Sequence, residues 1–361
     1  MFYYLSELKE LFFALNIFRY ITFRAGMAAV TTFLLCIIFG PFFIDKLRRM
    51  KIHEINKRKD CPDLDQFQNE KEGTPTMGGV FVIGSILISV LLWADLSNRY
   101  ILLTLVTCFS LALLGFADDY IKLTNPVQRG VKKRTKLVWQ IMLGFFVGTY
   151  VYFNPDTNSL LHFPFLKNAV INLGLFYIPF TALVVIGSSN AVNLTDGLDG
   201  LAIGCVLIVT MTLAIVSYIV GHINFSEYLF LPYINGAGEL SIFCAAIVGA
   251  SLGFLWFNCH PASVFMGDTG SLSLGGTLGV IAVFIKQEFV LAIAGGVFVM
   301  EALSVIIQII SVRGYGKKFF KLAPIHHHFQ MSGWKESKII IRFWILTIIF
   351  ALIALTTLKI R

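Results

Sequence analysis

The sequence predicts an all-α integral membrane protein with ten transmembrane helices and both termini on the periplasmic side. Of its 361 residues, 57% are hydrophobic and 14% are charged, against about 45–50% apolar and about 25% charged residues in soluble domains. A soluble core of this length cannot bury so much apolar surface, so lipid must solvate most of the chain. Long apolar stretches and an uneven distribution of basic residues between loops support the same class.

Apolar stretches close to the roughly 20 residues that a membrane-spanning helix requires recur along the chain. The ten expected spans lie at about 24–44, 77–93, 100–116, 137–153, 170–187, 200–220, 240–257, 272–286, 288–310 and 340–358. Before them, residues 1–20 should form an interfacial helix, because Leu5, Leu8, Phe12 and Leu15 fall on one helical face. The segment 154–169 should form an outer loop that includes a short hairpin. With no internal repeat, residues 1–361 are expected to form a single membrane domain.

The basic residues predict the orientation of these spans. The loop segments 45–76, 117–136 and 311–338 together hold twenty Lys and Arg residues, whereas the opposite loops hold only three. By the positive-inside rule, the basic loops face the cytoplasm. The net charge of +8 therefore follows from membrane topology, and no nucleic-acid partner is expected. The six cysteines form no CxxC pair and are expected to be reduced thiols.

Acidic residues gather in three of the cytoplasmic loops. Asp118 and Asp119 end the third span, where two adjacent carboxylates gain from sharing a cation. Asp268 precedes the eighth span, which Thr269 or Ser271 could cap, and whose N-terminus would attract phosphate. Mg²⁺ prefers one or two carboxylates together with phosphate oxygens. The alternatives are a solvated helix end for the acidic pair and a simple N-cap turn for Asp268.

The block NAVNLTDGLDGLA carries a third set of polar residues. Its Asn193, Asp196 and Asp199 are spaced three residues apart, which predicts that they share one face of a helical turn. Asx-Gly sequences also form ordinary turns. This block, however, interrupts two apolar spans and contains no basic residue, so its carboxylates are expected to meet an external cation or hydrogen-bond donors.

Histidines and bases complete the cytoplasmic set. His326, His327 and His328 follow Pro324, and hydrogen bonding to phosphate or to a leaving group is favoured over zinc, because consecutive side chains point in different directions. Glu301 lies within a span, and we interpret it as a link between helices rather than as part of the site. Basic side chains before the second and fourth spans suit a pyrophosphate substrate, as well as setting the topology.

These residues together favour phosphoryl transfer between a soluble nucleotide-like donor and a membrane-bound acceptor. A transporter is the alternative from another class, but it would place its ion site near the bilayer midplane, often between inverted repeats. A scaffold has no need of so many carboxylates and histidines on one side.

Five blocks in the same order carry a resemblance to a known family: KEGTPTMGG, GFADDYIK, NAVNLTDGLDGLA, FNCHPASVFMGDTGSLSLGG and PIHHHFQ. The chain resembles the phospho-N-acetylmuramoyl-pentapeptide-transferase (MraY) family, in the polyprenyl-phosphate N-acetylhexosamine-1-phosphate transferase superfamily. The resemblance implies transfer of phospho-MurNAc-pentapeptide from its UDP carrier to undecaprenyl phosphate, giving lipid I and UMP for peptidoglycan synthesis. It also implies Mg²⁺ as cofactor, ten transmembrane helices in the bacterial inner membrane, contact with membrane lipid and the homodimer that is frequent in this family.

The resemblance assigns roles to individual residues. Asp268 matches the Mg²⁺ ligand, Asp119 supports the same centre, and Asp118 is either a covalent nucleophile or a base. His326 and His327 fall in the block associated with catalysis and substrate binding. The expected substrate-binding residues are Lys71, Thr76, Lys136, Asn193, Asp196, Asp199, Asn258 and His328. Direct attack by the lipid phosphate is favoured, because a phosphate monoester with its second pKa near ~6 is already anionic. A sister transferase that moves phospho-GlcNAc is the alternative enzyme, and the PIHHHFQ block argues against it.

Overall fold

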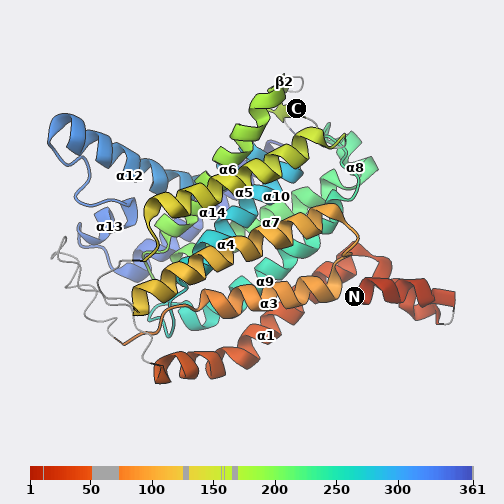
Figure 1. The fold of residues 1–361 in the computed structure, drawn as a ribbon, viewed down its shortest axis with the longest axis horizontal. Coiled ribbons are helices and arrows are strands. Elements are labelled where there is room, and N and C mark those ends of the chain that lie inside the picture. Colours follow the sequence, from red (N-terminus) through yellow and green to blue (C-terminus); the bar gives the residue numbers. More distant parts are fainter. Residues whose placement is uncertain are drawn as a thin grey trace.

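A computed structural model describes residues 1–10, 12–50, 73–124, 130–155, 157, 159–164 and 170–359. The described chain is a bundle of helices with one two-stranded hairpin, which confirms the all-α class (Figure 1). The short 3-10 helices are η1 (Phe2–Glu10), η2 (Phe13–Arg19), η4 (Gly174–Phe176) and η5 (Ala237–Glu239). The α-helices are α1 (Ile21–Arg49), α3 (Gly79–Trp93), α4 (Arg99–Thr124), α5 (Lys133–Phe153), α6 (Tyr177–Thr195), α7 (Leu201–Val220), α8 (Ile223–Tyr228), α9 (Leu240–Asn258), α10 (Gly267–Phe284), α11 (Glu288–Ala294), α12 (Gly296–Tyr315), α13 (Ile325–Gln330) and α14 (Glu336–Thr356). The strands are β1 (Leu160–His162) and β2 (Val170–Asn172), which pair antiparallel.

Eight helical segments are long and apolar enough to cross a membrane: α1, α4, α5, η4 with α6, α7, η5 with α9, α12 and α14. Many of their large apolar side chains are exposed, as expected where lipid is the solvent. The helix α3 has 15 residues and is shorter than the usual span. The helix α10 has 18 residues and is buried continuously from Thr269 to Phe284. These observations establish an integral membrane protein.

The buried helix α10 is the element on which the site is built. It packs against α4 and α6. At the contact with α4, a Cβ atom added to Gly115 would lie 2.3 Å from the carbonyl oxygen of Asp268. Only glycine permits so close an approach of two backbones. The contact brings the last turns of α4 beside the first turn of α10, and these are the turns that carry the predicted acidic residues.

The two ends of the bundle differ. Figure 1 shows α13 at the left, whereas α8, β2 and both chain termini lie away from it, at the right and the top. The helix α12 extends from the bundle at the upper left. Its apolar side chains are exposed on several faces, including Leu303, Ile309 and Val312. A helix with this surface requires lipid around it.

Several predicted boundaries were wrong. The fifth span was expected from residue 170, but Val170–Asn172 is a strand paired with Leu160–His162, because its β-branched residues also suit a sheet. A short hairpin was expected within the outer loop 154–169, but only its first strand lies there. The expected span 288–310 is divided into α11 and α12, and the adjacent Gly295 and Gly296 explain the break. The predicted N-terminal helix is replaced by η1 and η2, because Phe12 is extended (φ −148°, ψ 108°).

The cysteines are free where they are described. Cys36, Cys108, Cys205 and Cys244 are buried, and Cys259 is exposed. Cys61 lies outside the described residues.

Candidate active site

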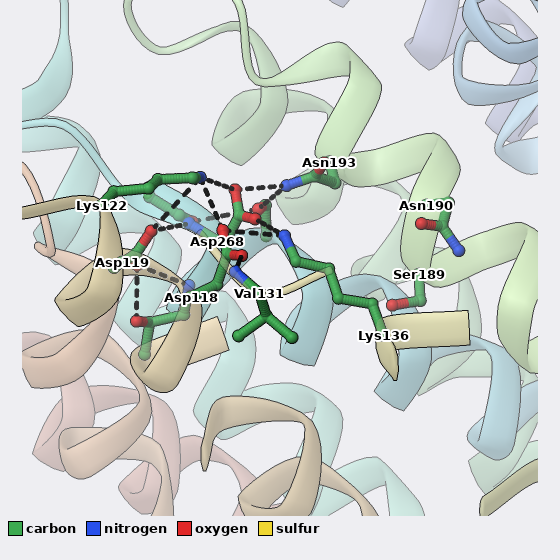
Figure 2. A network of polar contacts seen from close by, with 12 residues as sticks. Asp118, Asp119, Lys122, Val131, Lys136, Ser189, Asn190, Asn193 and Asp268 are labelled. Carbon is green, nitrogen blue, oxygen red and sulfur yellow. Dashed lines mark hydrogen bonds and ion pairs between the residues drawn. The ribbon is translucent and has the colours of Figure 1, made fainter. Parts of the chain in front are cut away.

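Three carboxylates from two helices meet at the end of the bundle (Figure 2). Asp118 and Asp119 lie in the last turns of α4, and Asp268 lies in the first turn of α10. One oxygen atom from each of the three carboxylates lies within 4.8 Å of the others. Asp118 and Asp119 are buried, and the side chain of Asp268 is 15% exposed. The sequence therefore identified three residues that the fold brings together, although about 150 positions separate Asp268 from the other two along the chain.

Two lysines neutralise these carboxylates. Lys136 Nζ lies 2.8 Å from Asp118 Oδ2 and 2.5 Å from Asp268 Oδ2. Lys122 Nζ lies 2.7 Å from Asp118 Oδ2 and 3.3 Å from Asp268 Oδ1. Lys136 was predicted to belong to the site, but Lys122 was missed. Its position one helical turn after the acidic pair was the signal, because side chains three and four residues apart are neighbours on a helix.

Asp119 binds the N-terminus of α10. Its carboxylate accepts hydrogen bonds from the backbone N–H groups of Asp268 (3.1 Å) and Thr269 (3.0 Å), and from the Thr269 hydroxyl (2.7 Å). The first N–H groups of a helix have no partner within the helix, so an anion from outside stabilises them. The prediction that Thr269 or Ser271 caps this helix was wrong, because α10 begins at Gly267 and both residues lie inside it.

Gly267 is required at the start of α10 for two reasons. Its φ of +76° lies in the left-handed region, which favours glycine. In addition, a Cβ atom there would lie 2.7 Å from Asp119 Oδ2 and 3.3 Å from Thr76 Oγ1. The predicted residue Thr76 is thus buried beside the carboxylates. Lys71, which was predicted in the same block, lies outside the described residues.

The predicted common face of Asn193, Asp196 and Asp199 was wrong. The helix α6 ends at Thr195, so only Asn193 is helical. Its Nδ2 donates hydrogen bonds to Asp268 Oδ1 (3.0 Å) and Ser271 Oγ (2.8 Å). Asp196 follows the helix with non-helical dihedral angles. Asp199 contacts residues of other segments. A spacing of three residues predicts a shared face only while the helix continues.

Asp199 belongs to a second polar cluster. Its Oδ2 lies 3.1 Å from His260 Nδ1 and accepts a hydrogen bond from the Ala262 N–H (3.1 Å). Glu336 completes the cluster, because its Oε1 accepts the Asp199 N–H (2.9 Å). One ligand atom from each of Asp199, His260 and Glu336 lies within 4.8 Å of the others, so by distance this mixed set could also hold a cation. Neither His260 nor Glu336 was predicted. The signal for His260 was its place in the block FNCHPASVFMGDTGSLSLGG, whereas Glu336 follows no recognisable pattern in the sequence.

Asn258 lies beside this cluster and is buried. Its Oδ1 accepts the Gly200 N–H (3.0 Å), and its Nδ2 donates to the Val264 carbonyl (2.8 Å). The amide thus joins Gly200, at the end of the loop between α6 and α7, to the segment that leads into α10.

The three histidines contact different partners, as expected for consecutive residues. His326 is fully buried, with Nδ1 3.1 Å from Glu301 Oε1, and its Nε2 packs against Gly197. His327 Nδ1 lies 2.7 Å from Gln330 Oε1, and His328 Nδ1 accepts the Lys321 N–H (3.2 Å). Glu301 was left out of the predicted site, but its contact with His326 places it in this block. The signal was its position as an acid inside an apolar span.

The electrostatics of the carboxylate cluster suit a hard cation and phosphates. Burial disfavours the charged form of Asp268, but the positive charges of Lys122 and Lys136 outweigh it and lower the pKa of this carboxyl below its usual range. Asp268 therefore remains an anion, as a metal ligand must. Three carboxylates supply the oxygen donors that Mg²⁺ prefers, and the two ammonium groups are suited to bind phosphate oxygens. The arrangement can bind and activate a pyrophosphate.

Comparisons with known proteins agree with this chemistry. Residues 101–286 match the family model of glycosyl transferase family 4, and residues 71–83 match signature 1 of phospho-N-acetylmuramoyl-pentapeptide-transferase. Curated relatives with that name include one from Pelobacter propionicus, 52% identical over 96% of both chains. Others are from Desulforapulum autotrophicum (50% identical over 100% of both chains) and Syntrophus aciditrophicus (47% identical over 100% of both chains). The chain therefore belongs to the phospho-N-acetylmuramoyl-pentapeptide-transferase family.

Proposed function

We propose that this enzyme transfers phospho-MurNAc-pentapeptide from UDP-MurNAc-pentapeptide to undecaprenyl phosphate, producing lipid I and UMP for peptidoglycan synthesis. The observation that carries the proposal is the meeting of Asp118, Asp119 and Asp268 with Lys122 and Lys136, in a chain that aligns over its full length with transferases of this name. The enzyme is a phosphoglycosyl transferase and a multi-pass protein of the bacterial inner membrane.

In the reaction, an anionic oxygen of undecaprenyl phosphate attacks the phosphorus that carries the sugar. The new P–O bond forms as the bond between the attacked phosphorus and the bridging oxygen of the pyrophosphate breaks, and UMP leaves with the bridging oxygen. Negative charge grows on the leaving phosphate and on the oxygens around the attacked phosphorus. Lys122 and Lys136 stabilise this charge, because preorganised cations in a buried site act more strongly than they do in water.

Asp118 is better suited to organise this site than to attack the substrate. Its Oδ2 lies within 2.8 Å of both lysine ammonium groups, and its Oδ1 accepts the Val131 N–H (2.7 Å). Contacts with three donors engage both oxygen atoms of the carboxylate and lower its nucleophilicity. A covalent phospho-Asp118 intermediate would also have to break these contacts. The geometry supports direct attack by the lipid phosphate, which needs little activation near neutral pH.

Mg²⁺ fits the oxygen donors of this cluster, with Asp268 as the principal ligand and Asp119 and Asp118 beside it. Bound there, the ion would neutralise charge on the pyrophosphate. Asn193 orients Asp268, and Asp119 fixes the turn of α10 on which Asp268 lies. Lys71, Thr76, Asp196, Asp199 and Asn258 contribute to the nucleotide-sugar side of the site. His326, His327 and His328 contribute to substrate binding and catalysis.

We also propose ten spans in a single membrane domain, with the site on the cytoplasmic side and both termini on the periplasmic side. The helices α3 and α10 would supply the two spans beyond the eight that length and hydropathy identify. Both termini lie away from α13 in Figure 1, as an even number of spans requires. The excess of basic residues in the site-bearing loops supports the orientation.

The test is UMP release by the purified protein in detergent, with UDP-MurNAc-pentapeptide and undecaprenyl phosphate, with and without Mg²⁺. We expect release only when both substrates and the metal are present. Release without the lipid acceptor would contradict direct attack and indicate a covalent intermediate or hydrolysis. Release from UDP-GlcNAc in place of the muramoyl substrate would reassign the enzyme to a sister transferase.

A further inference from the structure

The last long helix of the chain is tied directly to the loop between α6 and α7. Glu336 is the first residue of α14, and its Oε1 accepts the backbone N–H of Asp199 at 2.9 Å. The two residues are 137 positions apart in the sequence. The Glu336 side chain is 12% exposed, so water competes weakly for this hydrogen bond.

Asp199 extends the connection to a third segment. Its carboxylate Oδ2 contacts His260 Nδ1 and accepts the N–H of Ala262, both at 3.1 Å. The next residue, Gly200, donates its N–H to Asn258 Oδ1. Loop 196–200 is therefore held at two consecutive backbone N–H groups, one by α14 and the other by the end of α9.

The same loop leads back to the carboxylate cluster. It follows the last turn of α6, where Asn193 donates to Asp268 and Ser271. A shift of the loop would therefore displace residues on the nucleotide-sugar side of the site. Asn193 precedes the loop, and Glu336 contacts the loop near its other end. Glu336 accepts a backbone N–H, so this hydrogen bond does not depend on the side chains of the loop.

We propose that Glu336 is a positioning residue for the nucleotide-sugar pocket, and that it acts through the hydrogen bond it accepts from Asp199. The inference rests on the proposed function, because it assigns loop 196–200 to the nucleotide side of that reaction. Glu336 acts on binding of the nucleotide donor and not on binding of the lipid acceptor.

The oxygen of Glu336, rather than its charge, carries this role. The hydrogen bond to the Asp199 N–H needs only an acceptor atom at that point. His260 lies farther away than the Asp199 N–H, with its Nδ1 4.0 Å from Oε1. Glutamine supplies the same acceptor without the charge, so it should preserve the position of the loop, whereas alanine leaves the Asp199 N–H without this partner.

The experiment compares Glu336→Ala and Glu336→Gln with the unmodified enzyme. Glu227→Ala is the matched control, because Glu227 is an exposed acid in α8, away from α13. The readouts are KM for each substrate, kcat, the Kd of UMP by calorimetry and the melting temperature in detergent. We expect Glu336→Ala to raise the KM of the nucleotide donor and the Kd of UMP by up to about tenfold, the upper effect of one lost hydrogen bond between uncharged groups. The KM of undecaprenyl phosphate and kcat should change less than about twofold, and Glu336→Gln should restore tight binding.

Three outcomes would overturn the inference. If Glu336→Gln is as defective as Glu336→Ala, the charge is essential and the cluster acts as an ion site instead. If both KM values and the melting temperature change together, Glu336 only stabilises the fold. If UMP binds Glu336→Ala normally, the loop does not depend on this hydrogen bond. Failure of the proposed function would look different, because the unmodified enzyme would then release no UMP from UDP-MurNAc-pentapeptide.

Discussion

The ammonium group of Lys136 lies 2.5 Å from Oδ2 of Asp268, although the two residues are 132 positions apart in the sequence. The same ammonium group lies 2.8 Å from Asp118 Oδ2. One lysine at the start of α5 therefore joins carboxylates from α4 and α10 (Figure 2). The ammonium group can bind the phosphates of a substrate, and the carboxylates beside it can bind the cation that accompanies those phosphates.

Replacing Asp268 with Asn should abolish most activity. The amide keeps the shape of the side chain but removes the anion that would hold the metal, so charge on the pyrophosphate is no longer neutralised. We expect kcat to fall by about 100-fold or more, measured as UMP release. Asp45→Asn, at an exposed acid of α1, is the control. Near-normal turnover of Asp268→Asn at saturating Mg²⁺ would exclude the metal-binding role.

Lys136→Met should lower kcat/KM by about 100-fold, because one preorganised cation is lost from the position where negative charge develops. Lys133→Met is a matched control, since Lys133 is an exposed lysine in the same first turn of α5. The control should stay within about twofold of the unmodified enzyme. Equal losses in both variants would mean that general attraction by the basic loop, rather than the contact with Asp268, supports the reaction.

The sequence predicted the residue types of the site better than their arrangement. Asp118 and Asp119 were found because two adjacent carboxylates gain from sharing a cation. Asp268 was found because it precedes an apolar span whose N-terminus would attract phosphate. The arrangement of Asn193 and Asp199 was not predictable in the same way. It depends on where α6 ends, and a difference of one turn directs the two side chains to different clusters.

Residues that act through tertiary contacts were also missed. Glu336 looks like an ordinary acid in the first turn of a helix, and its role depends on Asp199, 137 positions away. Glu301 was interpreted as a link between helices, and its contact with His326 does join α12 to α13. Its partner His326 became evident only when the fold placed the two residues 3.1 Å apart.

The histidines should respond differently to alanine substitution. His326 is fully buried against Glu301 and Gly197, so His326→Ala leaves a cavity and a buried acid without its neighbour. We expect it to lower the free energy of unfolding by about 2–4 kcal/mol. His327 is only partly buried, so His327→Ala should lower kcat more than stability. Thermal unfolding and UMP release distinguish the two effects. If His327→Ala is absent from the membrane or unfolded, its catalytic role loses support.

Gly267→Ala should damage the site without removing any polar group. A Cβ atom at this position would meet Asp119 Oδ2 at 2.7 Å, and the φ of +76° is unfavourable for alanine. Asp119 would have to move away from the N–H groups of α10, which shifts Asp268 as well. We expect a loss of about 1–3 kcal/mol in stability and a clear fall in kcat. Gly314→Ala is the control, because its added Cβ meets no atom within 4 Å and α12 is helical there. Each of the two variants differs from the unmodified enzyme by one methyl group. Unchanged activity in Gly267→Ala would show that the contact between Asp119 and α10 does not position Asp268.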